Sequence, residues 1–100
     1  MVLAIYGATG ELPSSENFGL THQLRRSAAN VATRIAEGCG RDSNAEFAVE
    51  LRRAKAAASE LEYLLLLAHD LRYVGEERHR ELTESVVEVR KMISGLLRRL

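Results

Sequence analysis

The stretch "SNAEFAVELRRAKAAASELEYLLLLAH" (residues 43–69) decides the fold that the sequence predicts. Its apolar residues recur at alternating intervals of about four and three, the period of an α-helix that buries one face. They are Phe47, Leu51, Ala54, Ala58, Leu61, Leu65 and Ala68. Ser43 and Glu46 match a capping box, in which each side chain satisfies a free backbone N–H of the other. We therefore predict a long helix that starts after Ser43 and ends near residues 73–75.

Two other segments carry the same period. The segment before this helix has Leu24, Ala28, Val31 and Ile35, and the segment after it has Leu82, Val86, Val89, Ile93, Leu96 and Leu100. For the earlier helix we predict a cap at Ser14 or Ser15, Glu16 in the first turn, and an end at Gly38 in the left-handed conformation. The later helix is predicted to begin at Glu76.

The remaining N-terminal residues predict a short helix over 2–9 and a loop over 10–15, where Gly, Pro and Ser gather. Short connections between long helices place consecutive helices antiparallel. The predicted fold class is all-α: an antiparallel up-and-down four-helix bundle whose first helix is short, in one domain of residues 1–100.

The unequal helix lengths favour self-association. The three long helices span about 33–45 Å each, whereas residues 2–9 span only about 12 Å. Either an apolar groove stays open, or another chain fills it. Leu64, Leu67 and Leu71 add a second apolar stripe. The small residues of "SAANVAT" (27–33) indicate close neighbours on more than one side, or else Ser27, Asn30 and Thr33 simply face water. We predict a homo-oligomer.

Composition narrows the class of protein. The chain is 46% hydrophobic and 28% charged, which excludes a disordered tail, and its 14 basic residues balance its 14 acidic ones. A single cysteine cannot form an internal disulfide, which suits a reducing compartment. The apolar run at the start stops at Tyr6, too early for a signal peptide or a membrane span. We expect a soluble cytoplasmic protein with no membrane partner.

The sequence gives little support for a catalytic site or a metal site. A di-iron bundle needs two Glu-x-x-His pairs, and only Glu76 and His79 form one, with His22 and His69 apart from it in sequence. Cys39 lies at a helix C-terminus, where the helix dipole disfavours a thiolate. We expect no catalytic residue, no metal, no cofactor and no small-molecule substrate.

The segment "RIAEGCGR" (34–41) allows two interpretations. Its glycines lead toward a helix N-terminus, where a phosphate could bind, but it lacks the strand and the Gly-Lys-Ser/Thr ending of a nucleotide loop. We favour a structural corner held by an ion pair of Glu37 with Arg41 or of an arginine with Glu46. The predicted structural polar residues of this corner are Gln23, Glu37, Arg41 and Glu46.

Clustered basic residues could instead form a surface that binds nucleic acid. Arginines gather on the second helix and its corner, at Arg25, Arg26, Arg34 and Arg41. A second basic group comprises Arg90, Lys91, Arg98 and Arg99. Such patches bind phosphate backbones without reading the sequence, and assembly into a ring would multiply them. The competing interpretation is a solvated face that complements the helix dipoles.

Residues 12–47 also resemble a known family, the four-helix-bundle proteins encoded in intervening sequences of bacterial 23S ribosomal RNA genes. The signature falls on Pro13, Glu16, Phe18, Gly19, Leu20, Gln23, Leu24, Arg25, Arg26, Ile35, Ala36, Glu37, Gly38, Gly40, Arg41, Glu46 and Phe47. "SELEYLL" (59–65) and "KMISGLL" (91–97) match its later helices. The chain departs from the family pattern at Arg34, Glu50, Arg53 and Ala56–Ala57, and its first helix is shorter.

This resemblance implies a four-helix bundle in a homo-oligomer, with a ring of five subunits. A related bundle, the accessory protein of diversity-generating retroelements, binds nucleic acid. Our first hypothesis is therefore a non-enzymatic oligomeric scaffold that binds an RNA or DNA backbone through the four arginines named above. The alternative is a structural or protein-interaction module in which those arginines pair with acidic residues.

Overall fold

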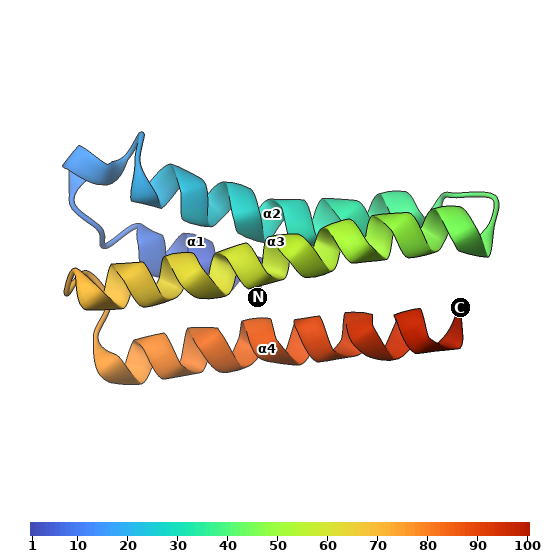
Figure 1. The fold of residues 1–100 in the computed structure, drawn as a ribbon. Helices are drawn as coiled ribbons and strands as arrows, with labels where there is room; N and C mark the ends of the chain where they lie inside the picture. Colours follow the sequence, from blue (N-terminus) through green and yellow to red (C-terminus); the bar gives the residue numbers. More distant parts are fainter.

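A computed structural model describes residues 1–100, and all of its regular structure is helical. The helices are α1 (Val2–Thr9), a 3-10 turn η1 (Ser14–Glu16), α2 (Leu20–Cys39), α3 (Asn44–Asp70) and α4 (Glu76–Arg99). Figure 1 shows α2, α3 and α4 lying side by side, with the α2–α3 connection at one end of the molecule and the α3–α4 connection at the other. The all-α prediction of four helices with a short first one is confirmed.

The core is a single cluster of apolar side chains from all four helices. Extensive contacts join α1 to α2, α2 to α3 and α3 to α4. The fully buried members include Ile5, Leu24, Val31, Leu51, Leu61, Leu65, Val86 and Ile93. Small residues at Ala28, Ala54 and Ala58 are also wholly buried, which lets α2 and α3 approach closely. None of the helices is both long and apolar enough to cross a membrane.

The predicted start of the second helix is wrong. Ser14 and Ser15 belong to the separate turn η1 and cap nothing, and α2 begins only at Leu20. Glu16 provides the cap instead, because its Oε1 accepts the N–H of Leu20 at 3.2 Å. Its other oxygen, Oε2, accepts the hydroxyl proton of Tyr73 at 3.0 Å. Glu16 thus ties η1 both to α2 and to the connection between α3 and α4.

Gly38 is not the left-handed terminator that the sequence predicted. It lies inside α2, which continues to Cys39, and no glycine in the chain has a positive φ. Gly38 is needed for space, because a Cβ there would stand 2.7 Å from Cδ1 of Phe47. The left-handed residue is Arg72, with φ 66°, which ends α3 at Asp70 rather than near residues 73–75.

Some predicted core positions remain exposed. In the seam of α4, Leu96 and Leu100 are 39% and 44% exposed. The second apolar stripe on α3 is mostly covered within the chain. Leu64 is buried and Leu67 packs against the core, so only Leu71 is exposed. In residues 27–33, Ser27, Ala28 and Val31 are buried, whereas Ala32 and Thr33 are exposed.

Candidate functional site

The corner between α2 and α3 is held by backbone caps. Ser43 Oγ accepts the N–H of Glu46 at 3.2 Å, as the capping box predicted. The Glu46 carboxylate accepts the N–H of Asp42 at 3.4 Å, not that of Ser43. An acidic side chain therefore occupies the N-terminus of α3, where a phosphate would otherwise bind. This arrangement favours the structural interpretation of the corner.

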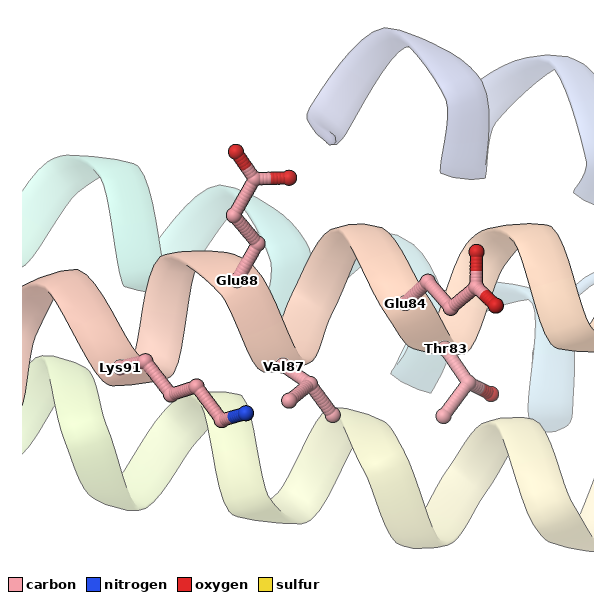
Figure 2. A pocket seen from close by; sticks show the side chains of 5 residues that line it. All are labelled: Thr83, Glu84, Val87, Glu88 and Lys91. Atoms are coloured by element: carbon pink, nitrogen blue, oxygen red, sulfur yellow. The ribbon is translucent and has the colours of Figure 1, made fainter.

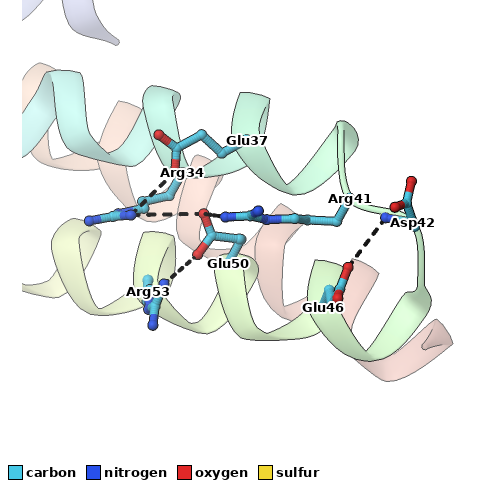
Figure 3. Close-up of polar contacts among 7 residues, drawn as sticks. All are labelled: Arg34, Glu37, Arg41, Asp42, Glu46, Glu50 and Arg53. Carbon is cyan, nitrogen blue, oxygen red and sulfur yellow. Dashed lines mark hydrogen bonds and ion pairs between the residues drawn. The ribbon is translucent and has the colours of Figure 1, made fainter.

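Glu50, which the sequence analysis did not select, is the centre of the charged cluster at this corner. Only 1% of its surface is exposed, on the first half of α3. Its Oε1 accepts a hydrogen bond from Arg53 at 2.7 Å, and its Oε2 lies 3.8 Å from both Arg34 and Arg41 (Figure 3). A buried charge requires such partners, because water no longer solvates it. We call Glu50 and its three arginines the Glu50 cluster.

The Glu50 cluster stays ionised at neutral pH. The neighbouring Glu37 carboxyl group and then the Arg53 and Arg34 guanidinium groups lower the pKa of Glu50, outweighing the desolvation that would raise it. Arg34 also bonds Glu37 at 3.2 Å. A carboxylate of this kind is a poor proton donor, and together with Glu37 it balances two of the three arginine charges. The arrangement is suited to joining α2 to α3.

The structure corrects the expected ion pairs of the corner. Arg41 pairs with Glu50 and with neither Glu37 nor Glu46. Glu37 pairs with Arg34, and Glu46 serves only as a cap. The one signal that could have found this cluster was the departure from the family pattern at Glu50 and Arg53.

Gln23 does not belong to the corner. It lies in the first turn of α2, near the opposite end of that helix, and lines a polar hollow of about 390 Å³ between α2 and α3. The residues that line this hollow are His22, Gln23, Arg26, Ser27, Asn30 and Glu60. Arg26 is exposed and forms no ion pair within the chain.

Arg25 has a different role from its neighbour. Its Nε donates to Thr9 Oγ1 at 2.8 Å and its Nη2 donates to the carbonyl oxygen of Tyr6 at 3.3 Å. The guanidinium also lies 4.9 Å from the centre of the Tyr6 ring, a cation–π contact. Arg25 thus fastens α1 to α2. Of the four arginines predicted as a nucleic-acid surface, Arg26 alone has no partner within the chain.

Two histidines that are distant in sequence meet at the α3–α4 end. The rings of His69 and His79 stack with their centroids 4.6 Å apart, and Nδ1 of His69 lies 3.0 Å from the carbonyl oxygen of Val74. The pKa of His79 is lowered by burial and then by His69. The fold therefore brings together two histidines that the sequence separates by ten residues. No group of three or more potential ligand side chains is arranged to hold a metal ion.

A further hollow of about 360 Å³ lies along α4 (Figure 2). All of its lining residues come from this one helix: Thr83, Glu84, Val87, Glu88 and Lys91. In Figure 2, Thr83, Val87 and Lys91 extend toward α3, whereas Glu84 and Glu88 extend away from it. Small-molecule sites are usually enclosed by several elements and are mostly apolar. Because one helix alone forms this hollow, it gives no sign of a substrate.

Comparison with known proteins bears on the resemblance noted in the sequence. The family model described as 23S rRNA-intervening sequence protein matches residues 1–95. None of the curated proteins matches the chain. A crystal structure of a protein with unknown function from the S23 ribosomal protein family of Bacteroides thetaiotaomicron VPI-5482 is similar, with a TM-score of 0.84 and 23% sequence identity. The alignment covers 96% of this chain and 87% of that one, and it supports the fold. The chain belongs to the 23S rRNA-intervening sequence protein family.

Proposed function

We propose that this protein is a non-enzymatic, antiparallel four-helix bundle that assembles with copies of itself into a scaffold. The observation that carries this proposal is the amount of large apolar surface that the chain leaves in water. Exposed members lie on α1, α3 and α4, and Phe18 before α2 is 98% exposed. Water disfavours such surface, and soluble monomers rarely keep extended apolar patches uncovered.

The end of the bundle near the α2–α3 corner supports the same proposal. The eight residues of α1 pack near the first half of α2, where Arg25 fastens them. Leu96 and Leu100 belong to the apolar seam of α4 yet remain more than one third exposed. A second copy of the chain would bury them.

Light scattering over a concentration series tests the scaffold proposal. We expect a mass that is a multiple of the 11.1 kDa chain mass at micromolar concentration. The ring of five subunits that the family resemblance implies would give five chain masses. A mass of one chain at every concentration would remove the proposal.

Binding of an RNA or DNA backbone is a second candidate, and Arg26 favours it. Its guanidinium is exposed beside the polar hollow that also holds His22, Gln23 and Asn30. Arg41 is half exposed, although it contacts Glu50. Arg25 and Arg34 are engaged within the chain. Fewer arginines are therefore available to bind phosphate than the four that the sequence predicted.

Titration of fluorescent single-stranded RNA at several salt concentrations tests this candidate. For a single strand, each phosphate contact that is lost lowers the slope of log K against log salt by about 0.7. We expect Arg26→Ala to weaken binding and to lower this slope, and Arg25→Ala to leave both unchanged. If the wild-type protein binds no RNA even at low salt, the candidate is rejected.

A further inference from the structure

Six polar side chains converge on the hollow between α2 and α3. They are His22, Gln23, Arg26, Ser27 and Asn30 of α2 and Glu60 of α3. None of these side chains takes part in a hydrogen bond or an ion pair within the chain. The hollow has a volume of about 390 Å³, within the range of ligand sites. Its hydrogen-bonding groups are therefore open to a ligand.

The side chains are arranged in an ordered way around this hollow. Ser27 lies at its floor, since only 4% of that residue is exposed. Gln23, Arg26 and Asn30 follow at intervals of three and four residues, which places them on one face of α2. A planar amide therefore stands about one helical turn away on each side of the guanidinium. Glu60 enters from α3, so a row of planar polar groups on one helix meets a carboxylate from the other.

The charges of the hollow narrow the class of ligand. Arg26 and Glu60 line the same space but do not form an ion pair with each other. An inorganic phosphate ion would meet the guanidinium on one side and the like charge of the carboxylate on the other. A metal cation would meet the opposite conflict. The hollow therefore suits a ligand that offers acceptors to α2 and donors to α3.

Guanine is the nucleobase with this arrangement of edge groups. Its N1–H and N2–H₂ are adjacent donors that one carboxylate binds together, and its O6 and N7 are adjacent acceptors that one arginine binds together. Adenine, cytosine and uracil have no two adjacent donor groups, so a carboxylate would face one of their acceptors. The imidazole of His22 adds a ring on which a base can stack. The hollow thus holds the groups that distinguish guanine from the other bases.

Other ligands with both kinds of group match the hollow less completely. A free amino acid would bring its carboxylate to Arg26 and its ammonium group to Glu60, but it would leave the amides of Gln23 and Asn30 without partners. Pockets for apolar ligands are mostly hydrophobic, whereas surfaces that bind nucleic acid are polar. All six residues that line this hollow are polar, which favours a nucleotide.

We propose that the hollow between α2 and α3 binds a guanine base, with Glu60 accepting from N1–H and N2–H₂ and Arg26 donating to O6 and N7. The base belongs to a free guanine nucleotide or to single-stranded RNA. Arg26 has five N–H donors, so those that the base does not use remain for a phosphate. The inference is independent of self-association. In its RNA form it rests on the second candidate function and names the part of the RNA that the hollow receives.

Isothermal titration calorimetry with mononucleotides provides the first test. GMP should bind about tenfold or more tightly than AMP, because a carboxylate and an arginine each make a bidentate contact only with guanine. GMP should also bind about tenfold more tightly than IMP, which lacks the 2-amino group and so loses one hydrogen bond to a charged acceptor. Equal binding of the three nucleotides, or no binding of GMP at millimolar concentration, overturns the inference.

Substitutions assign the binding to this hollow. Glu60→Ala protein should bind GMP and IMP equally, because the carboxylate that recognises the 2-amino group is absent. Arg26→Ala protein should bind GMP about tenfold more weakly and still prefer it to IMP. Both side chains are exposed, so helix content should not change. Glu88→Ala is the matched control, since Glu88 is exposed on α4 and forms no ion pair, and it should bind GMP as wild type does. A Glu60→Ala protein that still prefers GMP to IMP overturns the assignment.

Oligonucleotides distinguish the two sources of the base. Single-stranded RNA of about ten adenosines is compared with the same strand carrying two guanosines, at a length that covers one site. A preference for the guanosine strand that disappears in Glu60→Ala protein identifies RNA as the source. Binding of GMP without binding of RNA identifies the free nucleotide and rejects the RNA candidate alone. Binding of both strands equally, without binding of GMP, overturns the inference and leaves the RNA candidate standing.

Discussion

Gly38 of α2 lies directly against Phe47 of α3, so that a Cβ atom at position 38 would stand 2.7 Å from Phe47 Cδ1 and 3.2 Å from Glu50 Cβ. A larger residue would push the Phe47 ring away from the core. The role of this glycine is therefore steric and does not depend on its backbone freedom.

We expect Gly38→Ala to destabilise the protein by about 1–2 kcal/mol, because overpacking outweighs the better helix propensity of alanine. Urea denaturation would measure this change. Gly95 in α4 is the control, since the nearest atom to an added Cβ is 3.9 Å away. Gly95→Ala should stabilise the protein by about 0.5–1 kcal/mol. A stabilising Gly38→Ala would show that the contact with Phe47 imposes no constraint.

Glu50 should make stability dependent on pH in the acid range. Its pKa is lowered in the folded state, so the folded protein binds this proton less readily than the unfolded chain does. The stabilisation is complete above the ordinary value of 4.5 and is lost as the pH falls through the lower folded value. Thermal unfolding across this range should show Glu50→Gln to be less stable at pH 7 and less dependent on pH.

Glu81 is the control for this experiment, because its ion pair with Arg78 at 3.3 Å lies at the surface. Glu81→Gln should leave the unfolding temperature nearly unchanged, since exposed pairs contribute little. Equal effects of Glu50→Gln and Glu81→Gln would contradict the central role assigned to Glu50.

Arg25 and Arg26 are adjacent in sequence but should differ in their effect on α1. Loss of two hydrogen bonds and a cation–π contact in Arg25→Ala should cost about 1–2 kcal/mol. Amide hydrogen exchange in residues 2–9 should become faster in that variant. In Arg26→Ala, which loses no ion pair within the chain, exchange in residues 2–9 should match wild type. Faster exchange in both variants would mean that Arg25 does not hold α1 specifically.

Arg72 offers a stabilising substitution. It has φ 66° at the end of α3, where its N–H bonds the carbonyl oxygen of His69 and the N–H of Tyr73 bonds that of Ala68. Glycine takes this conformation without the steric cost that a side chain incurs. Arg72→Gly should raise the free energy of unfolding by about 0.5–1 kcal/mol in urea denaturation. Arg72→Val is expected to lower it, and the opposite order would refute the argument.

Helix periodicity and local capping were sufficient to predict much of this molecule. The spacing of Leu51, Leu61 and Leu65 predicts α3 because burial of one helical face depends on sequence period alone. The cap at Ser43 is equally local, since its partner Glu46 lies three residues away. The order of the helices and the shortness of α1 follow from such signals.

Only the tertiary structure decided what the polar and small residues do. Whether Arg41 pairs with Glu37, Glu46 or Glu50 depends on how α2 packs against α3, because the long arginine side chain can reach carboxylates on either helix. Glycine is a common helix terminator, but Gly38 is required for packing against Phe47. This contact joins two helices, so no local sequence pattern predicts it. By itself, the sequence determined the helices, through the spacing of its apolar residues. Three-dimensional packing decided the pairing of charges and the exposed face of α3, because packing brings together groups that are distant along the chain.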